Sequence, residues 1–208
     1  MTITDPNHTG PSPLKRWRGP LWGLAMAAAL GMAWYEGQTG STRPAAALPA
    51  GPGGAFALTA SDGTTFTERN LAGRPFAIYF GFTRCPEVCP TSLAKLARLR
   101  AKLGSDGARL AIVFVSVDPG HDKPADIGRY VTLFGTPIIG LTGSETQLAQ
   151  ITKAYGVYVA KVPQPGGDYT IDHTAATYLM DANGQFSNLI THDDTDEAAL
   201  VKLRQLVS

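Results

Sequence analysis

The chain has 208 residues, 44% of them hydrophobic, and a formal net charge of +1 at pH 7. This length suits one domain with an appended segment, and so small a net charge argues against a nucleic-acid partner. Two cysteines are too few for the disulfide framework of a small secreted protein.

The N-terminal part falls into three segments of different composition. Residues 1–18 are polar and end in a basic cluster, residues 19–35 carry no charge, and residues 36–54 are rich in Pro, Gly and Ala. This pattern predicts a cytoplasmic tail, a single transmembrane anchor and a linker. Trp22 and Trp34 would lie at the two membrane interfaces, and the basic residues before the anchor place the N-terminus in the cytoplasm.

We therefore expect a single-pass protein of the cytoplasmic (inner) membrane, with residues 55–208 folded in the periplasm or an equivalent extracytoplasmic space. A cleaved signal peptide would show the same charge pattern, with Gly31-Met32-Ala33 as a suitable cleavage site. In either case the rest of the chain leaves the cytoplasm. A buried core helix is a third alternative for residues 19–35.

Residues 55–208 contain strand and helix patterns in alternation. Two continuous apolar runs, 76–80 and 110–117, indicate strands buried on both faces. Further strands are expected in these segments: 56–67 as a hairpin, 137–141, 157–162, 168–171, 175–180 and 185–191. Helices, two of them with Ser144 and Thr195 as N-caps, are expected at 91–103, 124–134, 144–155 and 195–207. This order predicts a three-layer α/β domain with a mixed central sheet, an N-terminal hairpin and a late β-hairpin insertion.

Both cysteines lie in the stretch 81–90, GFTRCPEVCP, between the strand at 76–80 and a helix that Pro90 is expected to begin. A helix N-terminus favours the thiolate, which is both the nucleophile and the metal-binding form of cysteine. Inert thiols and a local structural disulfide are the alternatives for Cys85 and Cys89. Such a disulfide would close too small a loop to restrict the unfolded chain much, so we favour reactive thiols.

Two chemistries remain open for this pair. As a redox pair, Cys85 and Cys89 are separated by three residues, one more than in thioredoxin motifs, and can still form a disulfide across a turn. They would then be the catalytic residues. As metal ligands, two thiolates favour a soft ion such as Cu(I) or Zn(II). Structural zinc usually takes four protein ligands, so two cysteines completed by a histidine would suit copper better.

The four histidines of the chain differ as candidates for the third ligand. His8 is excluded by its place in the expected cytoplasmic tail, and His192 lies in a polar run typical of solvated surface. His121 follows a central strand, at the sheet edge where α/β domains bind ligands and where the Cys85 turn also lies. His173 lies between two strands, and spacing alone favours a hydrogen-bonded packing residue over a ligand.

The sequence resembles the SCO/SenC family of membrane-anchored copper proteins that serve cytochrome c oxidase assembly. Four segments carry the resemblance in order and spacing: GFTRCPEVCP (81–90), VSVDP (115–119), GLTG (140–143) and DHT (172–174). The resemblance extends from about Phe56 to the C-terminus. Glu87 stands where family members often carry Asp, a departure that keeps the charge.

The resemblance implies a thioredoxin-like fold and a copper site formed by Cys85, Cys89 and His173. This set suits Cu(I) in a trigonal arrangement and, with an added oxygen ligand, Cu(II). By the same implication, the carboxylates expected around these ligands are Asp172, Asp118 and Glu87. Asp172 equally suits a turn, and Asp118 equally suits a cap at the end of a strand.

The implied function is that of a copper chaperone that loads the binuclear copper centre of cytochrome c oxidase subunit II, or of another copper enzyme. An upstream periplasmic copper donor would supply the ion. The alternative is a thiol–disulfide oxidoreductase that reduces the cysteines of the same target and draws on a thiol reductant. Copper delivery needs His173, whereas disulfide exchange does not. A peroxidase-like enzyme activated by Arg84 and a copper sensor are two further interpretations.

Overall fold

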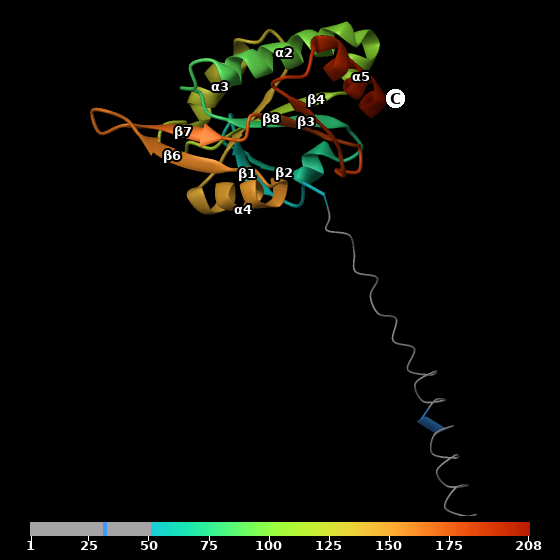
Figure 1. Ribbon diagram of the computed structural model, residues 1–208, viewed down its shortest axis with the longest axis horizontal. Helices are drawn as coiled ribbons and strands as arrows, with labels where there is room; N and C mark the ends of the chain where they lie inside the picture. Colours follow the sequence, from blue (N-terminus) through green and yellow to red (C-terminus); the bar gives the residue numbers. More distant parts are fainter. Residues whose placement is uncertain (1–30, 33–50) are drawn as a thin grey trace, which may run out of the picture. The chain divides into compact units, whose positions relative to one another are not determined.

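The computed structural model describes residues 31–32 and 51–208, and the latter lie within one compact unit (Figure 1). The expected cytoplasmic tail, the anchor apart from residues 31–32, and the linker up to residue 50 fall outside the described residues. In the part that is described, no helix is both long enough and apolar enough to cross a membrane.

The main sheet has seven strands in the order β2-β1-β5-β4-β3-β8-β9. Their bounds are β1 Ala57–Ala60, β2 Thr65–Thr67, β3 Phe76–Gly81, β4 Ala111–Ser116, β5 Ile139–Thr142, β8 Ala176–Met180 and β9 Phe186–Thr191. Parallel pairing joins β3 to β4 and β4 to β5, and the other pairs are antiparallel. Every residue of β3 and β4 is buried, as strands covered on both faces require. The mixed sheet and its N-terminal hairpin are therefore confirmed.

Helices cover both faces of this sheet. Their bounds are α2 Val88–Lys102, α3 Pro124–Thr132, α4 Glu145–Tyr155 and α5 Asp196–Val207, with 3₁₀ helices η2 Glu68–Leu71 and η3 Gly104–Ala108. Figure 1 shows α2, α3 and α5 on one face and α4 on the other, which gives the three expected layers. Leu93, Leu96 and Leu99 share one face of α2 and are buried.

Two helix starts follow the expected caps, and a third begins earlier than predicted. Ser144 Oγ accepts the Gln147 N–H at 3.3 Å while the Gln147 side chain accepts the Ser144 N–H at 2.9 Å, and Thr195 caps α5. Helix α2 begins at Val88, two residues before Pro90. Proline is tolerated there because the N–H groups of a first turn have no partner within the helix. Cys89 therefore lies inside the first turn of α2.

A second, two-stranded antiparallel sheet is formed by β6 (Val159–Pro163) and β7 (Tyr169–His173). The sequence predicts both strands but ends the second at residue 171, whereas β7 continues to His173. In Figure 1 this β6–β7 hairpin projects to one side of the main sheet. His173 thus lies where the hairpin returns to β8.

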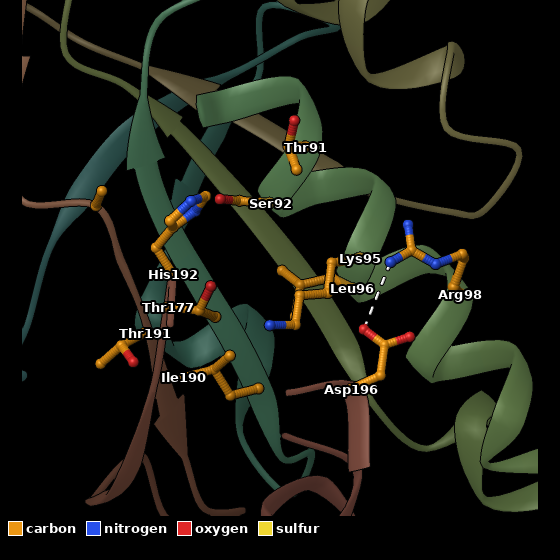
Figure 2. Close-up of a pocket in the computed structure, with 11 residues that line it drawn as sticks. Thr91, Ser92, Lys95, Leu96, Arg98, Thr177, Ile190, Thr191, His192 and Asp196 are labelled. Atoms are coloured by element: carbon orange, nitrogen blue, oxygen red, sulfur yellow. Dashed lines mark hydrogen bonds and ion pairs between the residues drawn. The ribbon is translucent and has the colours of Figure 1, made fainter. Parts of the chain in front are cut away.

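A cavity of about 230 Å³ lies between α2 and the β8–β9 pair (Figure 2). Thr177 and Ile190 line it from the strands, and Ser92 and Lys95 line it from the helix. His192 enters from the end of β9 with its imidazole directed toward Ser92. His192 is exposed, as the polar run around it predicts.

Candidate metal centre

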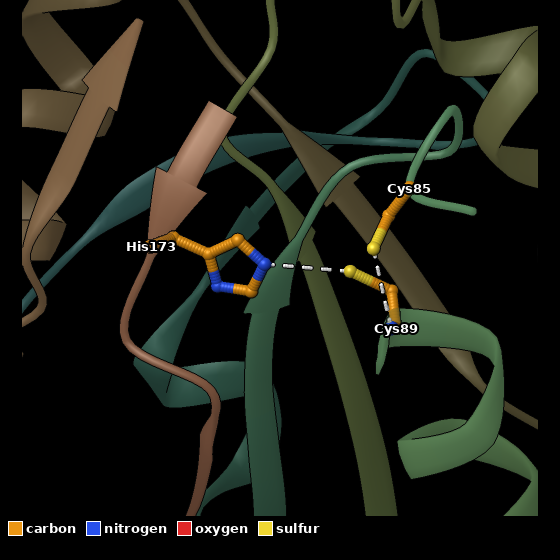
Figure 3. Close-up of side chains that lie close together, drawn as sticks. All are labelled: Cys85, Cys89 and His173. Carbon is orange, nitrogen blue, oxygen red and sulfur yellow. Dashed lines mark hydrogen bonds between the residues drawn. The ribbon is translucent and has the colours of Figure 1, made fainter. Parts of the chain in front are cut away.

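Cys85, Cys89 and His173 come together at the end of the β3 strand (Figure 3). The ligand atoms of the three side chains all lie within 4.8 Å of one another. Cys89 Sγ is 3.4 Å from His173 Nε2. The two cysteines, both among the described residues, are free thiols. Spacing alone leaves His173 as a packing residue, whereas the structure places its ring nitrogen beside a thiol.

The cysteines owe their position to the turn from β3 into α2. The backbone N–H of Cys89 belongs to the first turn of α2 and therefore lacks a partner within the helix. It donates to Cys85 Sγ at 3.4 Å, so the helix N-terminus faces this sulfur. Cys89 is buried, while Cys85 is half-buried. One thiol is thus held inside the domain and the other can be reached from solvent.

Gly81 allows the close approach of Cys89 to the strand. A Cβ added at Gly81 would lie 2.8 Å from Cys89 Sγ, 3.1 Å from Tyr79 Cε1 and 3.2 Å from Phe114 Cε2. These distances leave no room for any side chain. Gly81 therefore sets the depth at which the Cys89 sulfur lies.

The cysteine loop is held in place by hydrogen bonds to Asp122, whose side chain is buried. Its carboxylate accepts the Thr83 N–H at 2.8 Å, the Thr83 hydroxyl at 2.6 Å and the Ser116 hydroxyl. Buried carboxylates are stable only when hydrogen-bonded in this way. Neither Asp122 nor Thr83 stands out in the sequence as a site residue. The available signal was an acidic residue in the loop that follows a central strand.

His173 is held in one orientation by its surroundings. Its Nδ1 lies 3.1 Å from the Thr174 carbonyl, which can only accept, so Nδ1 donates and Nε2 is the nitrogen that faces Cys89 Sγ. Tyr79 and Phe82 both pack edge-on to the imidazole, with ring centroids 6.0 Å away. A backbone acceptor behind one ring nitrogen is typical of metal-binding histidines.

The two thiols differ in acidity. The hydrogen bond from Cys89 is the largest cause that lowers the pKa of Cys85 to about 5, aided by backbone N–H groups and opposed by burial. The pKa of Cys89 is raised, because its thiol donates to Cys85 and because it is buried. The reduced pair therefore holds one thiolate and one thiol at neutral pH. Binding a metal through both sulfurs releases the Cys89 proton.

Alkylation should reveal this difference. In the reduced, metal-free protein we expect iodoacetamide to modify Cys85 first, at a rate that falls only as pH drops through about 5, because the thiolate is the nucleophile. Mass spectrometry of the singly alkylated protein across pH 4–9 measures the profile. Cys89→Ala removes the hydrogen-bond donor and should move the midpoint upward. A wild-type rate that still climbs between pH 7 and 9 would contradict the assignment.

The remaining predicted residues lie around this group without joining it. Glu87 is exposed at the N-cap of α2, and Asp172 is exposed on β7, where neighbouring residues alternate between faces. Asp118 is buried, and its carboxylate contacts Arg84 and His121. His121 thus reaches the expected sheet edge but contacts charged side chains there. His8 lies outside the described residues.

The family model and the similar proteins point to the same family. The SCO1/SenC family model matches residues 45–208. The mitochondrial protein SCO2 of Saccharomyces cerevisiae is 36% identical over 158 residues, which cover 74% of this chain and 52% of that protein. Protein SCO1 homolog 1 of Arabidopsis thaliana is 40% identical over 135 residues, covering 64% and 40%. The chain thus spans about half the length of these relatives or less.

Solved structures agree with the fold. Copper-bound ScoI of Bradyrhizobium japonicum is 40% identical with a TM-score of 0.69, covering 74% of this chain and 99% of that one. Copper-bound yeast Sco1 is 37% identical with a TM-score of 0.70, covering 76% and 88%. The expected mixed α/β, thioredoxin-like fold is confirmed.

Proposed function

Because the chain belongs to the SCO1/SenC family, we propose that it binds copper through Cys85, Cys89 and His173 and serves the assembly of cytochrome c oxidase. The observation that carries this proposal is the grouping of three ligand atoms within 4.8 Å, in a fold shared with copper-bound relatives. Two sulfurs and one imidazole nitrogen form a soft, low-coordinate set that fits Cu(I). A structural zinc site would usually need a fourth protein ligand.

The finer proposal is delivery of copper to the binuclear centre of subunit II, or to another copper enzyme. An incoming thiolate of the target would replace the half-buried Cys85 as a ligand of the ion, while Cys89 and His173 keep the ion during ligand exchange. His173 belongs to a hairpin separate from the cysteine loop, so it can leave without disturbing the main sheet. An upstream periplasmic donor would reload the site.

We also propose that residues 19–35 anchor the chain in the cytoplasmic membrane, with the copper-binding domain on the periplasmic side. An uncharged segment preceded by basic residues supports this orientation. The linker would keep the domain near a membrane-bound target. Protease added to spheroplasts, whose cytoplasmic membrane is intact, should digest the domain. Protection of the domain would overturn this orientation.

Copper titration tests the ligand set. The reduced full-length chain should take one equivalent of Cu(I) from bicinchoninate. His173→Ala should lower the affinity more than about tenfold, because even altering a group that only hydrogen-bonds a metal ligand usually lowers the affinity by that factor. His192→Ala is the matched control, because it removes an exposed histidine that lies outside the cysteine group. Equal affinity of the His173→Ala and His192→Ala proteins would refute a role for His173 as a ligand.

Thiol–disulfide exchange is a second candidate, favoured by the lowered pKa of Cys85. The Cys85 thiolate would attack a target disulfide and release one target thiolate, and Cys89 would then displace the second to form a Cys85–Cys89 disulfide. The Cys89 proton passes to the released thiolate, and a thiol reductant restores the pair. His173→Ala should spare this exchange while it weakens copper binding, so one variant separates the two functions.

A further inference from the structure

The hairpin that carries His173 has little packing of its own. Of the residues in β6 and β7, all of which are described, Ile171 is the one that is buried. A two-stranded hairpin alone is marginally stable in water. Contacts with the rest of the domain must therefore decide where its strands lie.

Such contacts converge on Asp118, whose side chain is 0% exposed. The Tyr169 hydroxyl donates to Oδ1 at 2.6 Å, while Arg84 Nη2 and His121 Nδ1 lie 3.3 Å and 3.0 Å from Oδ2. Burial raises the pKa of this carboxyl, but its hydrogen-bonding neighbours outweigh burial and lower the pKa below its ordinary value. We call this group of five side chains the Asp118 cluster: Arg84, Asp118, His121, Asp168 and Tyr169.

Arg84 joins this cluster to the hairpin and to the cysteines. Its Nη1 donates to Asp168 Oδ2 at 2.8 Å, and its Nη2 donates to the Tyr169 carbonyl at 3.1 Å. The guanidinium carbon also lies 5.7 Å from the Tyr169 ring centroid. Because Arg84 directly precedes Cys85, one side chain connects the cysteine loop to the first residue of β7.

At the other end, next to His173, hydrogen bonds join the two flanks of the hairpin to each other. The Thr174 N–H donates to the Tyr158 carbonyl at 3.1 Å, and the Tyr158 N–H donates to Thr174 Oγ1 at 3.0 Å. Tyr169 and His173 lie at opposite ends of β7, about 13 Å apart at roughly 3.3 Å per residue. The His173 end is attached to the rest of the domain by the chain itself, which runs from α4 into β6 and from β7 into β8, and such an attachment alone would act as a hinge. The Asp118 cluster supplies the second attachment that prevents rotation about this hinge.

We propose that the Asp118 cluster latches the β6–β7 hairpin to the cysteine loop and thereby holds the His173 imidazole beside Cys89. Arg84 and Tyr169 are positioning residues, since they act through the orientation of β7. The effect on copper retention rests on the proposed function, whereas the effect on the hairpin does not. Without the latch all three ligands remain, but His173 leaves the site more often and copper is lost faster.

Three substitutions open the latch by different means. Tyr169→Phe removes the hydroxyl that donates to Asp118. Asp168→Asn removes the negative charge that faces Arg84. Gly120→Ala leaves every charge in place but puts a Cβ 2.5 Å from the Tyr169 hydroxyl, which must then move away from Asp118. A shared effect of the three variants would come from the latch, because they have no other change in common.

The first measurement is amide hydrogen exchange in the metal-free full-length chain. We expect exchange of residues 157–174 to rise about threefold to tenfold in each variant, as for loss of one partly exposed, charge-assisted hydrogen bond. The strands β3 and β4 should keep their protection. Lys102→Ala is the matched control, because it breaks an exposed ion pair with Asp196 about 20 Å along α2 from the cysteines. Hairpin exchange that matches this control in all three variants would overturn the latch.

The second measurement is the rate at which Cu(I) passes from the protein to bicinchoninate. Each latch variant should release Cu(I) faster by the factor seen in hydrogen exchange, and adding His173→Ala should abolish the difference between latched and unlatched proteins. A difference that persists without His173 would contradict positioning through this residue. If His173→Ala alone leaves release unchanged, the copper site itself is overturned, and hydrogen exchange decides for or against the latch.

Discussion

Replacing Cys89 with alanine is expected to lower the affinity for Cu(I) by more than about a hundredfold, because altering even a group behind a metal ligand typically costs 10–100-fold. Cys89 is central to the site, since its sulfur lies 3.4 Å from His173 Nε2 and its backbone N–H donates to Cys85 Sγ. The substitution removes one sulfur ligand and the hydrogen bond that keeps Cys85 ionised. Competition between the reduced full-length chain and bicinchoninate for Cu(I) measures the loss.

Thr91→Ala is the control for this experiment, because Thr91 lies two residues further along α2 with its side chain exposed. It shortens a side chain of the same helix without touching the sulfur group. Thermal unfolding of both proteins reports whether the fold survives. Binding by Cys89→Ala as tight as that of Thr91→Ala would remove Cys89 from the ligand set.

Gly81→Ala is expected to destabilise the domain by about 1–3 kcal/mol, the usual range for overpacking a core. The new methyl group would meet the Cys89 sulfur at 2.8 Å and two buried aromatic rings at 3.1–3.2 Å. The sulfur must shift from its present place, 3.4 Å from His173 Nε2, so copper affinity should fall together with stability. Urea unfolding and Cu(I) titration of the same variant test both parts.

Gly128→Ala makes the same chemical change where the structure has room. Gly128 lies inside α3, and the nearest atom to an added Cβ is Ser61 Cβ at 3.4 Å, an ordinary contact. Alanine in place of glycine within a helix usually adds about 0.5–1 kcal/mol of stability. The two variants should therefore change the unfolding free energy in opposite directions. Destabilisation of equal size in both would contradict the close approach at Gly81.

Local patterns predicted the elements that local forces decide. The runs at 76–80 and 110–117 are apolar throughout, and they form β3 and β4 at the centre of the sheet. Ser144 begins α4 because its hydroxyl can satisfy a free N–H three residues on. The predicted start of α2 is two residues late, because proline is commonest at the first helical position, whereas Pro90 is the third residue of α2, where its missing N–H also costs no helix hydrogen bond.

The candidate site was predictable only in part, because half of it comes from contacts between distant segments. Cys85 and Cys89 are neighbours in sequence, so their turn could be inferred directly. His173 is 84 residues from Cys89, and its place beside the thiol depends on how the β6–β7 hairpin returns to the sheet. The family resemblance supplied this ligand where periodicity did not. Arg84 and Asp168 are also 84 residues apart, and neither belongs to a local pattern that predicts their ion pair.

The distance in sequence between Cys89 and His173 has a consequence for the lifetime of the protein. An ion bound to both would join the ends of a long chain segment, as a removable cross-link that reduces the entropy of the unfolded state. An ion that instead leaves the chain on unfolding stabilises the native state by preferential binding, which grows with the logarithm of the free metal concentration above the dissociation constant. A molecule that has just given up its copper would then be the more easily unfolded and degraded form, so turnover would favour removal of empty chains over loaded ones.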